Sequence, residues 1–222
     1  MPASAGFFIW GFIMRMSDRG VAALLAHEGI VPGPYLDSEG NWTFGVGHTA
    51  QAGLPDPAKM PRGIPADLEA ALREVFRVFR QDLLKYETEV LDAVRVPLAQ
   101  HEFDALVSFH FNTGGIGRAR LTSYLNADDR KSAANAFFGW MQPSSIADRR
   151  RAEERLFRTG FYPSSQITVW GVTTTGRVVW SPIRRLLIDE ALAFLRPAPA
   201  VVVNPFAGLL AFLSSIFSRK GA

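Results

Sequence analysis

The chain has 222 residues, 48% of them hydrophobic and 20% charged, a balance that excludes wholesale disorder. It contains no cysteine, so disulfides and cysteine-ligated metals are excluded. The net charge of +3 fits either a mild preference for an anionic partner or an ordinary solvated surface, and no nucleic-acid-binding module is recognisable, so we predict no nucleic-acid partner.

Residues 1–16 form an apolar N-terminal extension. The apolar run over residues 5–14 is shorter than the roughly 20 residues that a membrane-spanning helix needs. It also lacks the basic residues that precede the apolar part of a secretory signal. Three interpretations remain: a weak export or anchoring segment, a helix packed on the body, or an upstream start codon, and the last is favoured because Met14 and Met16 are plausible starts.

The next segment predicts a helix followed by a β-hairpin. Ser17 is a good N-cap for a helix that runs to Glu28, and Gly29 is typical of a helix end. Prolines and glycine at residues 32–34 exclude a helix there, and the residues up to 50 alternate as a hairpin with a four-residue turn. A loop rich in proline and glycine follows.

Helical periodicity dominates from residue 66 to residue 158. Apolar residues over 66–96 form one broad stripe, which fits a long helix or a short helix joined to a longer one, and Pro97 ends it. A second, apolar helix is predicted over residues 99–113. Shorter helices are predicted over residues 119–126, 129–141 and 146–158.

The pattern changes after Pro163. β-Branched residues and tryptophans flank a Thr/Gly turn, which predicts a second hairpin, and Ser181-Pro182 predicts the start of a helix to about Leu195. We therefore divide the chain into the extension 1–16, a body over 17–163, an extra hairpin plus helix over 164–196, and a linker with an apolar amphipathic tail over 197–222. The tail fits either contact with a membrane surface or packing against protein.

Three residues of the first helix and hairpin suit acid–base chemistry. Glu28 ends the helix, Asp37 lies on the first hairpin strand and Thr43 lies on the return strand, so the three side chains can meet in one cleft. The negative end of the helix dipole disfavours the ionised form of a carboxyl at its tip, as a general acid requires. From their spacing alone, ordinary surface charges would be the favoured interpretation of Glu28 and Asp37.

The residues around them carry a specific resemblance. The string HEGIVPGPYLDSEGNWTFGVGHT, residues 27–49, resembles the phage-type lysozymes (muramidases) of glycoside hydrolase family 24. Their signature has Glu-Gly, eight residues between that Glu and an Asp, five more before a Thr, and then Gly-x-Gly-His. Segments 97–114 and 149–162 resemble later motifs, although MQPSSIAD over 141–148 replaces a glycine-containing linker.

The resemblance implies an α+β, lysozyme-like fold. A small N-terminal lobe with the β-hairpin and a larger helical C-terminal lobe are joined by a long helix, and substrate lies in the groove between them. It also implies inverting hydrolysis of the β-1,4 bond between N-acetylmuramic acid and N-acetylglucosamine. Glu28 is then the general acid, and Asp37 and Thr43 hold the attacking water, with the two carboxyls roughly 6.5–9.5 Å apart.

Three supporting residues follow from the resemblance. His48 is expected to pair with Asp82 on the long helix, a structural role that is favoured over metal binding because the chain has no cluster of potential metal ligands. Arg149 is the candidate cation beside Glu28, with Arg150 and Arg151 as alternatives.

Aromatic and amide side chains are the candidates for sugar binding. Phe111 and Asn112 lie where the family lines its cleft, although Phe111 fits the core equally well. Trp140 is a further candidate for stacking on sugar, although a place in the core is favoured. Trp170 and Trp180 fit either a wall-binding platform or, as we favour, the core of the second hairpin.

These inferences predict an endolysin that cuts peptidoglycan and lyses the host. It is expected to be a monomer that needs no cofactor or metal, to be made in the host cytoplasm and to act on the wall in the periplasm. Two alternatives remain: a non-catalytic wall-binding or virion structural protein on the same fold, and a membrane-disrupting tail on a lysozyme body.

Overall fold

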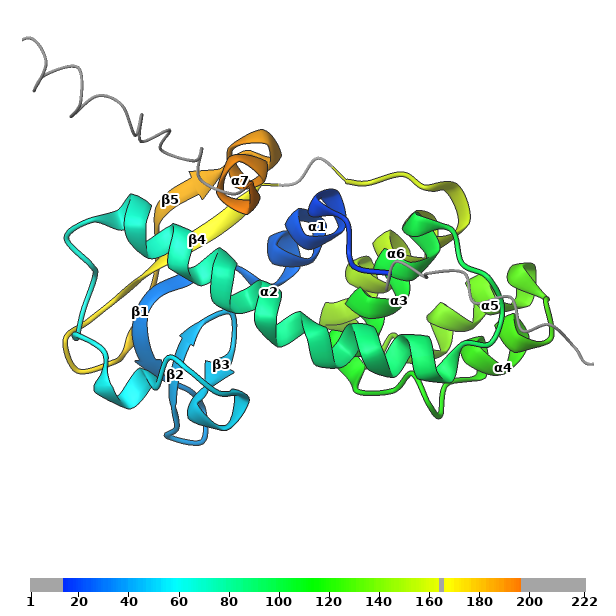
Figure 1. Cartoon of the computed structure of the whole chain (residues 1–222), viewed down its shortest axis with the longest axis horizontal. Coiled ribbons are helices and arrows are strands. Elements are labelled where there is room, and N and C mark those ends of the chain that lie inside the picture. The colour runs from blue at the N-terminus through cyan, green and yellow to red at the C-terminus, as the bar shows by residue number, and fades with distance from the viewer. Residues whose placement is uncertain (1–13, 164–165, 197–222) are drawn as a thin grey trace, which may run out of the picture.

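The computed structural model describes residues 14–163 and 166–196 (Figure 1). The long helix α2 (Leu68–Ala93) runs past two lobes, one containing all the strands and the other built from helices. The predicted α+β arrangement is therefore confirmed. The expectations for residues 1–13 and for the tail over 197–222 lie outside the described residues.

The first helix follows the sequence closely. Helix α1 (Asp18–Glu28) begins after Ser17, whose hydroxyl accepts a hydrogen bond from the Gly20 N–H at 3.0 Å. The helix ends at Gly29, whose φ of 74° favours glycine. Ser17 fixes the start of the helix and Gly29 fixes its end, so Glu28 lies in the last turn.

The first hairpin forms with one additional short strand. Strands β1 (Val31–Leu36), β2 (Trp42–Gly45) and β3 (His48–Thr49) form an antiparallel sheet in the order β1-β2-β3. Tyr35 is opposite Thr43, and Thr43 is opposite Thr49. Two short 3-10 helices, Ala50–Ala52 and Pro57–Lys59, follow.

Helix α2 is one continuous helix, which decides between the two alternatives left by the sequence. Asp67 caps it by accepting the Ala70 N–H at 2.9 Å. The C-terminal lobe contains α3 (Gln100–Thr113), α4 (Arg120–Asn126), α5 (Arg130–Ala136) and α6 (Ala147–Thr159). The helix predicted over 129–141 was too long, because α5 ends at Ala136 and tightens into a 3-10 turn (Phe137–Trp140); a second such turn is Ser144–Ile146.

The second hairpin is also present, but the helix after it starts later than predicted. Strands β4 (Ile167–Val172) and β5 (Val178–Leu186) are antiparallel, and α7 spans Ile188–Leu195. The prediction of a helix from Ser181 was wrong because Pro182 lies within β5. Its partner is Trp170, where the register shifts, and such an irregularity tolerates a residue without an N–H.

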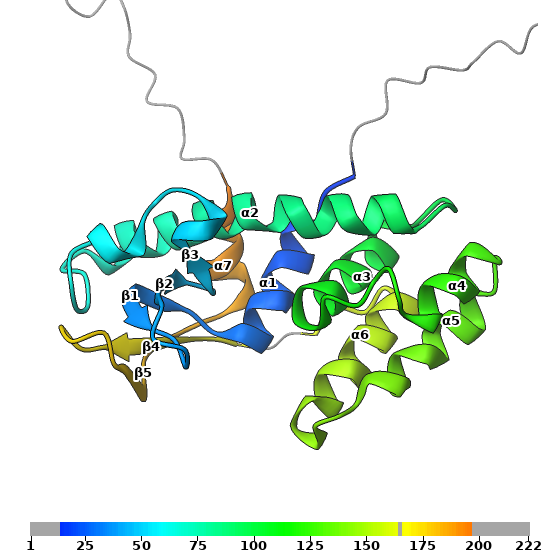
Figure 2. The same cartoon turned by 90° about the horizontal axis from the view of Figure 1, so that it is seen from below.

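The second hairpin packs onto the N-terminal lobe instead of standing apart from it. The Ile30 N–H donates to the Thr168 carbonyl and the Trp170 N–H donates to the Ile30 carbonyl, both at 2.8 Å. At the other end of β1, the Leu36 N–H donates to the Gly176 carbonyl at 2.8 Å. Figure 2 shows the two hairpins side by side.

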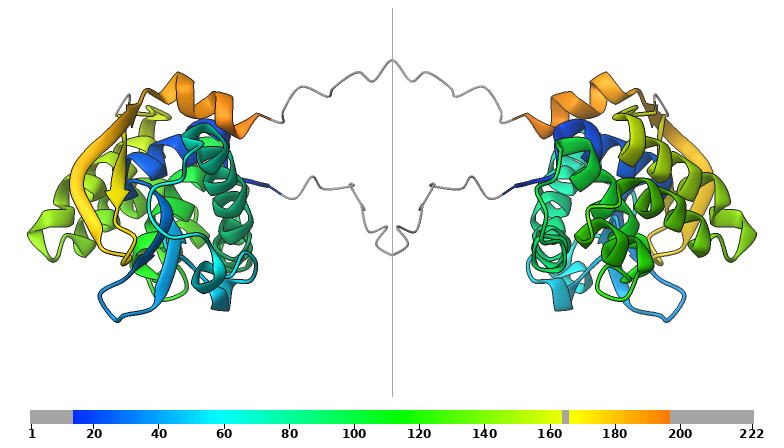
Figure 3. Two further views of the ribbon diagram at one scale, coloured as in Figure 1. Left: turned by 90° about the vertical axis from the view of Figure 1, so that its left-hand side faces the viewer. Right: turned by 90° about the vertical axis from the view of Figure 1, so that its right-hand side faces the viewer.

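Residues of the hairpin and of α7 complete the core of this lobe. Helix α7 packs against α1 and α2, as Figure 3 shows, and the rings of Phe194 and Phe76 stack with centroids 5.4 Å apart. Four residues of this segment have no exposed surface: Ile167, Val169, Leu186 and Ala191. Among residues 14–163 and 166–196, no helix has the length and apolar character needed to cross a membrane.

Candidate active site

A cleft of about 830 Å³ opens beside the C-terminal end of α1. Its walls come from the first sheet, from residues 81–86 of α2, from the end of α3 and from the second hairpin. Glu28, Tyr35, Asp82, Phe111 and Trp180 are among the residues that line it. Its volume lies in the range typical of ligand sites.

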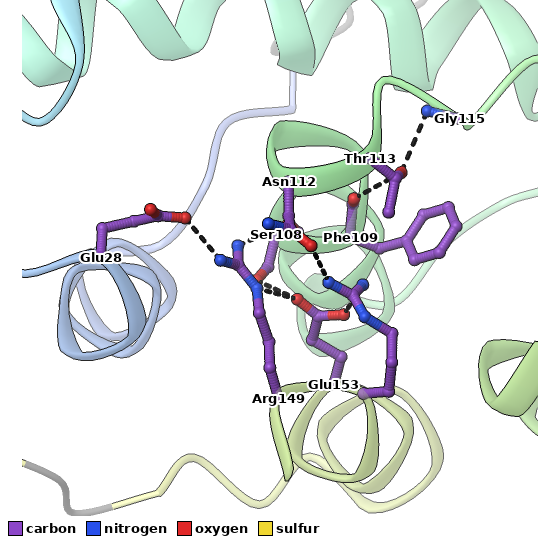
Figure 4. Close-up of polar contacts among 9 residues, drawn as sticks. Glu28, Ser108, Phe109, Asn112, Thr113, Gly115, Arg149 and Glu153 are labelled. Carbon is purple, nitrogen blue, oxygen red and sulfur yellow. Dashed lines mark hydrogen bonds and ion pairs between the residues drawn. The ribbon is translucent and has the colours of Figure 1, made fainter. Parts of the chain in front are cut away.

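Glu28 reaches this cleft from the tip of α1, and its carboxylate is held by a cation from the other lobe (Figure 4). Arg149 Nη1 donates to Glu28 Oε1 at 2.5 Å. The Glu28 side chain is 26% exposed, whereas that of Arg149 is 9% exposed. The acid therefore remains accessible while the cation that orients it is nearly buried.

Further hydrogen bonds fix the Arg149 guanidinium. Its Nε donates to Glu153 Oε1 at 2.9 Å, and its Nη2 donates to the Ser108 carbonyl at 3.1 Å. The Ser108 hydroxyl donates to the same Glu153 oxygen at 2.8 Å. Arg149 thus connects the tip of α1 to α3 and α6, as Figure 4 shows.

The structure decides which arginine neighbours Glu28. Arg149 does, whereas Arg150 binds Glu153 and Arg151 pairs with Asp148 at the surface. Burial raises the pKa of Glu153, and the charges of Arg149 and Arg150 oppose that rise. The two guanidiniums therefore favour the ionised form of this buried carboxyl.

Replacing Arg149 should release the Glu28 carboxylate and leave Glu153 with one cation. We expect Arg149→Met to lower the free energy of unfolding by about 3 kcal/mol, since one partner of a buried ion pair is lost. We expect Arg149→Lys to recover part of the stability and only part of kcat, because an ammonium cannot reproduce the three directional contacts. Urea unfolding and wall-hydrolysis rates measure both effects. Full activity of Arg149→Met would contradict a positioning role.

The prediction that Asp37 lies on the first strand was wrong, because β1 ends at Leu36 and Asp37 is the first residue of the turn between β1 and β2. Backbone N–H groups of this turn bind its carboxylate. Its Oδ1 accepts the N–H groups of Glu39 and Asn41 at 2.9 and 2.8 Å. Hydrogen bonds, chiefly from the Asn41 N–H, lower the pKa of Asp37. Hydrogen bonds from the turn consequently keep the carboxylate ionised and oriented.

Thr43 is buried opposite Tyr35, and its hydroxyl donates to the Asn41 carbonyl at 3.1 Å. Tyr35 and Thr43 are directly opposed, so their side chains share one face of the sheet. Asp37 lies beyond the end of β1, and neither Asp37 nor Thr43 is among the residues that line the cleft. Tyr35 lines the cleft, as does Thr49, which is opposite Thr43.

Tyr35 is a cleft residue that our sequence analysis missed. Burial is the largest cause of the rise in its pKa to about 12, and the charges of Asp37 and Glu28 raise it further. Tyr35 therefore lies within electrostatic reach of both carboxylates. Its position two residues before Asp37 on a predicted strand was the signal that could have identified it.

His48 and Asp82 lie together, as the resemblance implied. His48 Nδ1 is 2.9 Å from Asp82 Oδ2, and His48 Nε2 is 2.8 Å from the Pro55 carbonyl. This buried ring fastens the first sheet and the following loop to α2. Among the residues that the structure describes, no group of three potential ligands could hold a metal ion.

The three candidate sugar-binding residues have different surroundings. Phe111 lines the cleft and packs against Tyr86, with ring centroids 4.9 Å apart. The side-chain oxygen of Asn112 accepts a hydrogen bond from the Arg150 guanidinium, so this oxygen already has a partner. Trp140 is not among the residues lining the cleft, because its ring packs edge-on against Phe109, centroids 5.2 Å apart, within the C-terminal lobe.

The sequence and fold match one family. A profile described as phage lysozyme matches residues 25–154, more than half of the chain. The chain belongs to the phage lysozyme family. It is accordingly a lysozyme-type hydrolase.

Individual relatives agree with this membership. The endolysin of Salmonella phage P22 is 34% identical over 151 residues, which are 99% of that protein and 65% of this chain. The endolysin of Acyrthosiphon pisum secondary endosymbiont phage 1 is 27% identical over 157 residues, which are 99% of that protein and 66% of this chain.

Solved structures show the same fold. A mutant P22 lysozyme superposes with a TM-score of 0.55 at 32% identity, covering 98% of that chain and 65% of this one. The muramidase domain of SpmX from Asticaccaulis excentricus superposes with a TM-score of 0.54 at 28% identity, covering 98% of that chain and 65% of this one. About a third of this chain therefore has no counterpart in these proteins, and the family match ends before β4 begins.

Proposed function

We propose that the chain is a muramidase that hydrolyses the β-1,4 bond between N-acetylmuramic acid and N-acetylglucosamine in peptidoglycan. The observation that supports this most directly is the Glu28 carboxylate at the edge of an open cleft, oriented by a nearly buried Arg149. Glu28 protonates the leaving O4 of N-acetylglucosamine as the bond to C1 of N-acetylmuramic acid breaks.

Asp37 and Thr43 activate the water that attacks C1. An ionised carboxylate accepts a proton from that water, and hydrogen bonds keep Asp37 ionised. The Thr43 hydroxyl donates to Asn41 and retains lone pairs that accept a hydrogen bond from the water. Attack from the face opposite the leaving group inverts the configuration at C1.

The biological setting that we propose follows the relatives, which are named endolysins. The enzyme is made in the host cytoplasm, acts as a monomer on peptidoglycan in the periplasm and lyses the host. We also propose that residues 17–163 carry the catalytic residues, while residues 167–196 complete the core of the same domain. Contact between the tail and a membrane surface belongs to the same proposal.

Digestion of purified peptidoglycan in ¹⁸O-labelled water tests the reaction. We expect one labelled oxygen at C1 of each new reducing N-acetylmuramic acid end, because hydrolysis adds water across the broken bond. Mass spectrometry measures the label, and early NMR spectra are expected to show the α anomer first. Anhydro ends would indicate an internal transfer in place of hydrolysis, and binding without any products would favour a non-catalytic wall-binding protein.

A further inference from the structure

The second hairpin brings two tryptophans to the wall of the cleft that contains Glu28. Trp170, Val178 and Trp180 line this cleft. A Cβ placed on Gly29 would lie 2.7 Å from Trp170 Nε1, so the Trp170 indole lies directly against the residue that follows Glu28. This wall is built by residues beyond the family match.

The rings of Trp170 and Trp180 are in contact, and they differ in how far each is exposed to solvent. Their centroids are 5.4 Å apart with an angle of 72° between the planes. Trp170 is half-buried, whereas Trp180 is 76% exposed. The interpretation of Trp180 as part of the hairpin core was therefore wrong, and a large aromatic surface faces the cleft.

The hairpin holds these rings in a fixed position. Strand β4 is hydrogen-bonded to Ile30, and the hairpin turn is hydrogen-bonded to Leu36. Val169 and Leu186 are fully buried in the core. Val178 and Trp180 line the cleft, whereas Val179 lies against Gly171 on the other side of β5 and does not line the cleft. A preformed aromatic surface loses little freedom when a ligand binds to it.

We propose that Trp180, supported by Trp170, forms a subsite that binds a sugar ring of the peptidoglycan strand beyond the bond at Glu28. The inference rests on the proposed function. A pyranose ring presents a face of C–H groups that packs on an aromatic face, and aromatic side chains with a few polar groups are typical of ligand clefts. The continuity of this surface with the Glu28 cleft identifies the occupant as the substrate strand.

Binding to washed, protein-free peptidoglycan sacculi tests the subsite without turnover. The full-length chain carrying Glu28→Gln is the parent, and sedimentation gives its dissociation constant. We expect Trp180→Ala to weaken binding about tenfold, as the loss of one well-packed aromatic contact does. Trp180→Tyr, which keeps a ring, should bind within about threefold of the parent, a small free-energy change.

Two further variants separate ring stacking from general hydrophobicity. Trp180→Leu keeps an apolar side chain without a ring and should bind as weakly as Trp180→Ala. Val179→Ala, one residue away on the opposite side of β5, should bind like the parent. Parent-like binding of Trp180→Leu, or weak binding of Val179→Ala, would overturn the stacking subsite.

Kinetics distinguish a failed subsite from a failed function. In the active chain, Trp180→Ala should raise KM about tenfold on long glycan strands and leave kcat within about twofold, since an indole ring takes no part in the proton transfers. If the wild type is active and Trp180→Ala has unchanged binding and an unchanged KM, the subsite is rejected and the proposed function is retained. A wild type that cleaves nothing, yet binds sacculi through Trp180, would reject the proposed function and retain the subsite.

Discussion

Glu28→Gln should lower the rate of peptidoglycan hydrolysis by a factor of about a hundred to ten thousand, the usual contribution of a positioned general acid. Glutamine has the same shape and can still accept a hydrogen bond from Arg149, but it cannot donate a proton to the leaving oxygen. The side chain is partly exposed, so the loss of its ion pair should change the free energy of unfolding by only about 1 kcal/mol. Loss of turbidity of a sacculus suspension measures the rate, and circular dichroism checks the fold.

Glu74→Gln is a matched control for this variant. Glu74 is an exposed glutamate that also pairs with an arginine, Arg77, on the outer surface of α2. It should hydrolyse peptidoglycan at the wild-type rate. If Glu28→Gln cleaved sacculi as fast as Glu74→Gln, Glu28 would not be the acid. If Glu28→Gln lysed living cells without cleaving sacculi, the membrane-disrupting tail would be the better explanation.

Local signals in the sequence were sufficient to place Glu28 at the end of α1. Ser17 and Gly29 determine where α1 begins and ends, and Glu28 follows from them. Alternation along β1 and β2 predicts the hairpin that carries Thr43 on β2, and Asp37 follows directly after the last residue of β1. Each of these features depends on residues close together in the chain, which is why it could be predicted.

The features that the sequence did not predict depend on contacts between residues far apart in the chain. Nothing near Ile30 indicates that its N–H and carbonyl pair with β4, nearly 140 residues later. Trp180 was assigned to a hairpin core because the sequence could not show that the other side of the hairpin packs on β1. Trp140 was a candidate for the cleft with the core favoured, and its packing on Phe109, a property of the folded C-terminal lobe, agrees with the core position.

The wrongly predicted start of the last helix has a similar cause. Ser181-Pro182 has the composition of a helix start, yet the pairing of β5 with β4 extends through it and α7 begins at Ile188. In its place, Glu190 accepts the Leu187 N–H at 2.7 Å at the start of α7. A local cap signal is outweighed where tertiary pairing stabilises the extended conformation.

A chain ending at Pro163 should fail to fold cooperatively, although the family match lies entirely within it. The truncation removes Ile167, Val169 and Leu186, all fully buried. Burial of each such side chain contributes about 1.5–3 kcal/mol, so the three together approach the total stability of about 5–15 kcal/mol that a domain has. The truncation also leaves apolar surface of α1 and α2 uncovered, because α7 packs on both helices.

Two point substitutions in the full chain isolate this contribution. Leu186 is fully buried and its neighbour Leu187 is 56% exposed. We expect Leu186→Ala to lower the free energy of unfolding by about 2–5 kcal/mol, and Leu187→Ala by less than about 0.5 kcal/mol. Urea unfolding followed by circular dichroism measures both. A chain ending at Pro163 that unfolds cooperatively at the wild-type midpoint, or equal effects of the two leucine substitutions, would mean that the second hairpin is an attachment to an independently stable body and not part of its core.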